Sequence, residues 1–430
     1  MDAMQLAALL VTLTTCFAYI NHRALRLPPT TGLMAISLAF SLGLAALVRT
    51  VPGLGRTVES FVGRIDLNVA LLHVMLGSLL FAGALEMPLG HLTRRRLAIF
   101  ALVTVGVAIS TVVVGELSWA VFRLVGVEVQ PIYCFVFGAL ISPTDPVAVV
   151  GMLKRSQAPA DLRAEIAGES LFNDGVSLAF FIGLLATALK GRPIETSQFG
   201  MLLLRQGLGG VGLGLVVGLV AYQAIKPVNS YRLEILITLS VALGGYALAE
   251  SLHVSAPIAV VVAGVIIGNH AWDFAMSDET RTRLRDFWEL VDEFLNAVLF
   301  VLVGLEALVL DFTPGLIFAG VLMIPVMLLA RLISVLIARG LVWGEPNPRR
   351  TAVLLTWGGL KGAISVALAL GVPREFDGRP IPERDVLVAI TYIVVVFSIL
   401  VQGLSFDRYV RRVFGKRGGE DVRPDAVQPD

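Results

Sequence analysis

The residues best suited to chemistry are a hydroxyl, an amide and a carboxylate grouped at Ser170, Asn173 and Asp174. Their spacings of three and four residues place them on one face of a helix. Oxygen ligands of these kinds suit a hard cation. A carboxylate that can bind either a metal cation or a proton is also the least that a protein needs to exchange one for the other. This segment therefore indicates an ion-binding site centred on Asp174.

A second polar run, Ser-Pro-Thr-Asp-Pro at 142–146, lies in the middle of an apolar stretch. Its two prolines remove backbone donors and disfavour a continuous helix, so Asp145 is expected beside freed carbonyls and a half-helix end that could meet a cation. A comparable run, Trp-Gly-Gly-Leu-Lys-Gly at 357–362, contains Lys361. That lysine either places positive charge near the site or ties the unwound segment to carbonyls. We assign Ser142 and Lys361 to support of the unwound segments.

The composition shows what kind of structure must hold these residues. Of the 430 residues, 56% are hydrophobic and 16% are charged, and the mean hydropathy is +0.81. These values exclude a soluble globular enzyme. The net charge of +1 gives no electrostatic case for nucleic acid as a partner, and Cys16 and Cys134 lie in apolar runs that support neither a disulfide framework nor a metal cluster.

Windows of about 20 apolar residues, the length that crosses a bilayer, predict an all-α polytopic membrane protein. About thirteen spans are expected, at 3–21, 27–48, 65–87, 97–122, 131–153, 163–189, 199–225, 233–252, 255–269, 287–309, 314–338, 351–371 and 385–407. The connections on one side carry more than twice as many Lys and Arg residues as those on the other. The positive-inside rule then places the amino terminus outside and the carboxyl terminus in the cytoplasm.

The two interrupted spans, the fifth and the twelfth, are seven apart. If the seventh span is a linker, they occupy equivalent positions in two six-helix halves of opposite topology. Interruptions at corresponding positions of two halves point to the binding site of a transporter. The alternative is two unrelated kinks.

Other ionisable residues fall within the spans, where burying a charge is costly. Glu169 and Arg331 are expected at similar depths, which favours an ion pair; the alternative is that each is solvated near the inner mouth. His73 lies in the middle of the third span and is more typical of a hydrogen-bonded core histidine than of a pH sensor.

Taken together, these motifs resemble those of the monovalent cation:proton antiporters, the sodium/proton exchanger superfamily. The resemblance runs from the first span to about Arg412 and rests on four pieces in order, namely 142–146, 168–174, Arg331, and Gly358 to Ala363. It implies that Asp174 binds a cation or a proton, that Thr144, Asp145 and Ser170 contribute oxygens to a transported Na⁺, and that Asn173 marks the electroneutral branch. Two departures are Lys361, where arginine is common, and Ala82, where an acidic residue is common.

The resemblance also implies a six-plus-six inverted repeat and a homodimer in the plasma membrane. The expected divisions are dimerisation or scaffold helices at 1–96 and 231–312, ion-transporting core helices at 97–190 and 313–412, a linker helix at 191–230, and a disordered cytoplasmic tail at 413–430. No cofactor is expected beyond the transported Na⁺ or Li⁺ and H⁺.

The leading hypothesis is therefore exchange of Na⁺ or Li⁺ for H⁺ by alternating access, serving pH and sodium homeostasis. A K⁺/H⁺ antiporter of the same fold is the nearest alternative, and a cation channel is weaker because the polar residues cluster at one depth. A serine hydrolase is disfavoured because Phe172 replaces the last glycine of a Gly-x-Ser-x-Gly elbow.

Overall fold

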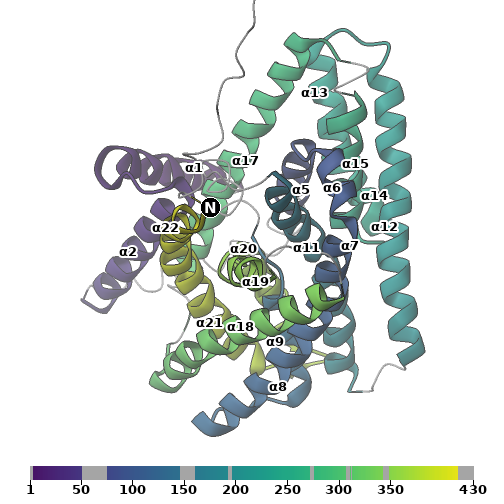
Figure 1. Cartoon of the computed structure of the whole chain (residues 1–430). Coiled ribbons are helices and arrows are strands. Elements are labelled where there is room, and N and C mark those ends of the chain that lie inside the picture. The colour runs from purple at the N-terminus through teal and green to yellow at the C-terminus, as the bar shows by residue number, and fades with distance from the viewer. Residues whose placement is uncertain are drawn as a thin grey trace, which may run out of the picture.

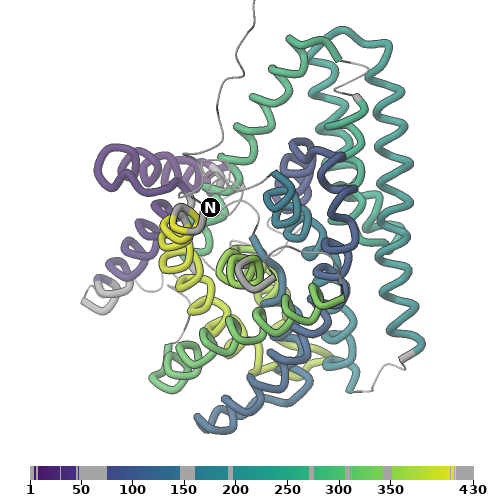
Figure 2. The backbone as a smooth tube through the Cα atoms, in the orientation of Figure 1, coloured from purple at the N-terminus to yellow at the C-terminus, as the bar shows by residue number. Residues whose placement is uncertain are grey.

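The structure is a computed structural model of the whole chain (Figure 2). It describes residues 3–50, 75–145, 160–191, 196–271, 276–306, 310, 312–341 and 348–414. His73, the beginning of the third expected span, the last part of the fifth from residue 146 on, and nearly all of the expected tail lie outside the described residues. The count of thirteen spans therefore stays a prediction.

Helices make up nearly all of the described chain (Figure 1). The first half comprises α1 (Ala3–Ile20), η1 (Asn21–Leu25), α2 (Pro29–Thr50), α5 (Leu76–Leu85), α6 (Leu89–Arg94), α7 (Arg96–Ala101), η3 (Leu102–Gly106), α8 (Val107–Val125), α9 (Pro131–Ile141), α11 (Ala160–Lys190) and α12 (Thr196–Ile225). The second half comprises α13 (Tyr231–Leu239), η4 (Ser240–Gly244), α14 (Gly245–Ser251), α15 (Ala256–Ile266), η5 (Ile267–Ala271), α17 (Asp278–Glu306), α18 (Pro314–Gly340), α19 (Pro348–Trp357), α20 (Ala363–Leu370), α21 (Glu383–Phe397), η6 (Ser398–Gln402) and α22 (Gly403–Phe414). Elements labelled η are π-helical turns.

Between α20 and α21 the chain forms a small hairpin. Its strands β1 (Glu375–Phe376) and β2 (Arg379–Pro380) are antiparallel, with Glu375 opposite Pro380 and Phe376 opposite Arg379. The turn residues Asp377 and Gly378 both have positive φ, at 53° and 71°. A two-residue turn of this kind matches the twist of the flanking strands.

Two expected boundaries were wrong, and both errors have the same physical cause. The helix expected at 287 begins at Asp278, and the helix expected to end at 407 continues to Phe414. In each case the additional turns carry charged residues, so a window that detects apolar residues cannot include them.

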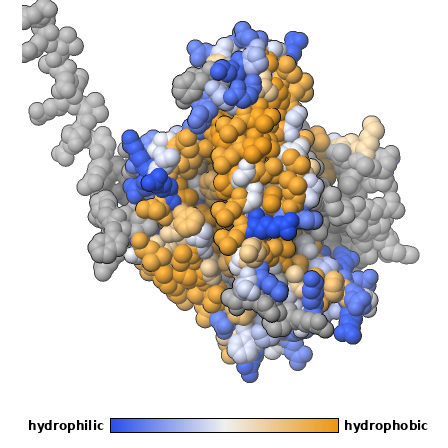
Figure 3. Space-filling view, turned by 90° about the vertical axis from the view of Figure 1, so that its right-hand side faces the viewer, coloured by the Kyte–Doolittle hydropathy of each residue, from blue (hydrophilic) through white to orange (hydrophobic). Residues whose placement is uncertain are grey.

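The described helices fit a membrane by length and composition. Six of them are long and apolar enough to cross, and four shorter apolar helices accompany them. On the side of α12, Figure 3 shows a broad hydrophobic surface between hydrophilic groups at its two ends. Large exposed apolar side chains on α12 contribute to this surface, among them Met201, Leu204, Leu208, Leu215 and Leu219. Such a surface matches the hydrocarbon layer of a bilayer.

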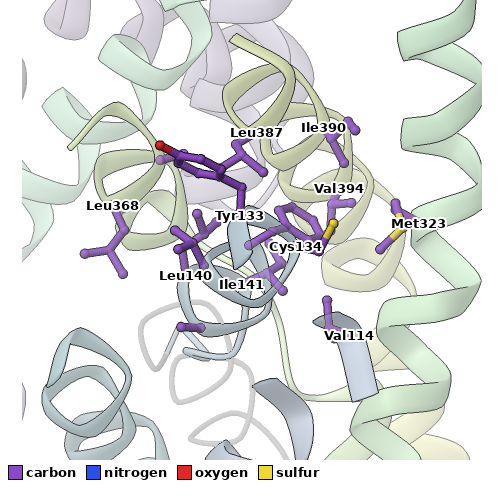
Figure 4. Packing of buried hydrophobic residues seen from close by; sticks show 14 of the residues in the cluster. Val114, Tyr133, Cys134, Leu140, Ile141, Met323, Leu368, Leu387, Ile390 and Val394 are labelled. Carbon is purple, nitrogen blue, oxygen red and sulfur yellow. The ribbon is translucent and has the colours of Figure 1, made fainter. Parts of the chain in front are cut away.

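The interior is densely packed around α9. Tyr133, Cys134, Leu140 and Ile141 of this helix are buried against side chains of α8, α18, α20 and α21 (Figure 4). A Cβ at Gly138 would collide with the backbone carbonyl of Thr111 on α8, so the two helices meet at a distance that only glycine permits. This packing fixes the end of α9, where the first interruption begins.

We expect Gly138→Ala to destabilise the protein, because the added methyl group must displace the backbone of α8. Overpacking of this kind costs about 1 to 3 kcal/mol of unfolding free energy. Gly207→Ala is the matched control, since a Cβ there meets no atom within 4 Å. Thermal unfolding in detergent should show a lower midpoint for Gly138→Ala only; equal midpoints for the two variants would contradict the close helix contact.

Candidate ion-binding site

Helix α11 carries the three side chains that the spacing places on one face. Asp161 lies in its first turn, where an acidic residue complements the helix dipole. Ser170, Asn173 and Asp174 are 3%, 1% and 2% exposed, so the polar face of α11 points into the protein. Helix α11 contacts α20, and both lie near the centre of Figure 1.

The interruption after α9 brings a second set of oxygens to this face. The backbone leaves the helix at Ser142, and Thr144 and Asp145 follow in non-helical conformation. Thr144 Oγ1 lies 2.9 Å from Ser170 Oγ and accepts a hydrogen bond of 2.7 Å from Asn173 Nδ2. The two motifs that stand out in the sequence are therefore joined directly through Thr144.

Three oxygens at this junction have no hydrogen-bond partner among the described residues. They are Oδ1 and Oδ2 of Asp174 and Oδ1 of Asn173. Buried polar atoms are almost always paired, so a cluster of unpaired acceptors calls for an explanation. A carboxylate surrounded by hydroxyl and amide oxygens can hold a hard cation, or can be neutralised by a proton instead.

The second interruption, between α19 and α20, packs directly against the first. Lys361 Nζ donates to the carbonyl oxygens of Ser142 and Pro143, at 2.9 and 3.1 Å. The amide of Asp145 donates to the carbonyl of Leu360 at 2.8 Å. Of the two roles left open for Lys361, the structure places its side-chain nitrogen on these carbonyls.

Two further details fix this contact. A Cβ at Gly362 would overlap the carboxyl group of Asp145, so glycine is required at that position. The hydroxyl of Ser142 donates to the carbonyl of Gly138 at 2.7 Å and lies 3.0 Å from Ser110 Oγ. The Ser142 side chain therefore hydrogen-bonds the last turn of α9, and the Ser142 carbonyl accepts a hydrogen bond from Lys361 Nζ.

Glu169 and Arg331 form a buried ion pair beside the site. The guanidinium contacts both carboxylate oxygens, at 2.5 and 2.9 Å, and its Nε also donates to the carbonyl of Leu355 on α19 at 3.3 Å. A bidentate pair of this kind neutralises the carboxylate. Glu169 is thus engaged by an arginine, whereas the Asp174 oxygens are not.

Sequence reasoning missed a second ion pair nearer the amino-terminal end of α11. Glu165 and Arg339 are both buried and in contact at 2.5 Å, and Arg95 lies 3.9 Å from the other oxygen of Glu165. Asp161 contacts His91 at 2.6 Å. The available signal was the spacing of 161, 165 and 169, which puts three acidic residues on one face of a helix.

Ala82, the residue on α5 for which the resemblance implies an acid, lies in apolar surroundings. Ala82 is buried in an apolar cluster with Phe81, Leu85 and Trp288. This position supplies no side-chain oxygen. The oxygens gathered at the described site come from α11 and from the segment after α9.

Comparison with known proteins agrees with this architecture. A family model described as the transmembrane region of sodium/hydrogen exchangers matches residues 10–412. The Na⁺/H⁺ antiporter NhaP of Pseudomonas aeruginosa is 44% identical over 417 residues, covering 96% of this chain and 97% of that protein. The Na⁺/H⁺ antiporter NhaH of Halobacillus aidingensis is 32% identical over 364 residues, covering 83% and 86%.

The solved structure of the sodium proton antiporter MjNhaP1 from Methanocaldococcus jannaschii has the same fold. The TM-score is 0.75 with 17% sequence identity, and the match covers 97% of this chain and all of that one. Two interrupted helices that contact each other beside a buried carboxylate are typical of a membrane transporter. The chain belongs to the sodium/hydrogen exchanger family, and it is a multi-pass membrane protein.

We expect the Glu169 and Arg331 substitutions to be strongly non-additive. Glu169→Gln or Arg331→Gln alone leaves a buried charge without its partner, which costs about 3 to 5 kcal/mol. The double variant removes both charges and should unfold at a higher temperature than either single variant. Thermal unfolding of the four proteins measures the coupling; losses that simply add would contradict the pair.

Proposed function

We propose that this protein exchanges Na⁺ or Li⁺ for H⁺ across the membrane by alternating access. The observation that carries the proposal is the buried carboxylate of Asp174, whose two oxygens lack hydrogen-bond partners among the described residues and lie beside the Thr144 and Ser170 hydroxyls. The relatives named above are Na⁺/H⁺ antiporters, which supports the same cation here.

In this proposal Asp174, Asp145, Thr144 and Ser170 supply the oxygens that hold the cation. Asn173 contributes by donating to Thr144 Oγ1, which orients the hydroxyl toward Ser170 and the ion. A proton on Asp174 removes the charge that attracts the cation, so occupation by one excludes the other. The K⁺/H⁺ antiporter and channel alternatives gain no support from the relatives.

We also propose the division into moving and stationary parts. The core would comprise 97–190 and 313–412, because the two interruptions and the Glu169–Arg331 pair tie these ranges together. The scaffold and dimerisation helices would be 1–96 and 231–312, joined through the linker helix at 191–230. We further propose that the protein is a homodimer in the plasma membrane, as the family resemblance implies. The distribution of Lys and Arg supports an amino terminus outside and a 413–430 tail in the cytoplasm.

Asp174→Asn should abolish exchange, because an amide can neither release a proton nor offer a negative charge to the cation. We expect Na⁺-driven proton movement in proteoliposomes to fall to the level of protein-free vesicles. Asp385→Asn is the control, since that side chain is 81% exposed at the start of α21. Wild-type exchange by purified Asp174→Asn would overturn the assignment.

Exchange should be electroneutral, one proton for each cation. Asn173 cannot titrate, and if Asp145 stays ionised or backbone-bonded throughout, only Asp174 alternates between its two ligands. A membrane potential, worth about 2.3 kcal/mol per charge per 100 mV, would then have nothing to act on. The initial rate of Na⁺-driven proton flux should not change when valinomycin clamps the potential; a clear dependence would identify Asp145 as a second proton carrier.

A further inference from the structure

One peptide group in the second interruption is held from both sides. The peptide between Leu360 and Lys361 accepts a hydrogen bond from the Asp145 amide through its carbonyl, at 2.8 Å. Its N–H donates to the hydroxyl of Ser398, at 2.7 Å. A peptide is planar, so its carbonyl and N–H turn together. The contact with Ser398 therefore also fixes the direction of the bond to Asp145.

The position of Ser398 in the fold suits it to hold this peptide. It is completely buried and is the first residue of η6, the π-helical turn between α21 and α22. Single π-helical turns within longer helices are frequent at functional sites.

The same helical segment also holds the other end of the interruption. Gln402 Nε2 donates to the carbonyl of Trp357 at 3.3 Å, and Trp357 Nε1 donates to Ser405 Oγ at 3.0 Å. A Cβ at Gly358 would lie 2.8 Å from the ring of Phe406, so this ring packs on the glycine backbone. Residues 357–361 are thus held along their length by η6 and the beginning of α22.

We propose that Ser398 is a positioning residue for the ion site: its hydroxyl fixes the Leu360–Lys361 peptide, and this peptide holds the backbone of Asp145. The inference rests on the proposed function insofar as Asp145 is a cation ligand. Ser398 touches neither the ion nor the carboxylates, and it acts only through the peptide. Loss of the Ser398 hydroxyl leaves the buried N–H of Lys361 without its acceptor. If the Leu360–Lys361 peptide rotates so that this N–H meets another acceptor, the Leu360 carbonyl turns away from the Asp145 amide.

The test compares full-length variants in lipid nanodiscs and proteoliposomes. Ser398→Ala removes the acceptor, and Ser398→Thr keeps a hydroxyl at the same position. Ser37→Ala is the matched control, because Ser37 is equally buried and, within the described part of the chain, its hydroxyl donates to the carbonyl of Leu33 in its own helix and to no other element. If Ser398→Ala does not purify, Ser398→Cys replaces it, since its volume is similar and sulfur is a weak acceptor.

The first readout is hydrogen exchange at the Asp145 amide, measured by mass spectrometry. Ser398→Ala should accelerate this exchange, whereas Ser37→Ala and Ser398→Thr should leave it at the wild-type rate. A residue with a merely local structural role would not affect an amide on a different broken helix. Unchanged protection of Asp145 in Ser398→Ala would overturn the inference.

The second readout is the Na⁺ dependence of proton flux. Ser398→Ala should raise the apparent KM for Na⁺ about tenfold, equivalent to about 1.4 kcal/mol, with a maximal rate close to that of Ser37→Ala. A fall in maximal rate at unchanged KM would contradict the positioning role. If the wild type itself shows no Na⁺-driven flux, the proposed function fails, and exchange at the Asp145 amide still decides the role of Ser398.

Discussion

Backbone groups inside a bilayer need partners within the protein, because no water is available to supply them. Breaking two helices near the middle of the membrane frees such groups, and each break satisfies those of the other. Lys361 binds the carbonyls of Ser142 and Pro143, and the Leu360 carbonyl accepts from Asp145. The interruptions are therefore stable only in contact, and this contact places Thr144 and Asp145 against the polar face of α11.

The same need for partners separates the acidic residues of α11 into two kinds. Glu165 and Glu169 each contact an arginine of α18, and such pairs hold two helices together at the cost of desolvating both charges. Asp174 forms no ion pair with an arginine among the described residues, and both of its carboxylate oxygens lack hydrogen-bond partners there. Under the proposed function, the carboxylate that has no arginine partner is the one that binds the transported ion.

The prolines of 142–146 and the glycines of 357–362, each within an apolar stretch, were sufficient to predict the two interruptions, because both depend on local sequence. The depth of Glu169 and Arg331 could also be counted along their helices, and the structure brings the two together. The contacts of Glu165 and of Ser398 could not be predicted in this way. They depend on how each helix is rotated about its axis, which a window of apolar residues in a nearly all-apolar span does not determine.

Asn173 illustrates why a site residue cannot be replaced by its closest analogue. Its Nδ2 donates to Thr144 Oγ1, and an ionised aspartate could not donate this bond. An aspartate there would also place a second titratable carboxylate next to Asp174, which like-charge repulsion disfavours. The Asn173 amide therefore has two effects under the proposed exchange. It orients the Thr144 hydroxyl, and it leaves one carboxylate at this end of the site, Asp174, to alternate between proton and cation. The geometry of the site and its charge balance thus depend on the same side chain.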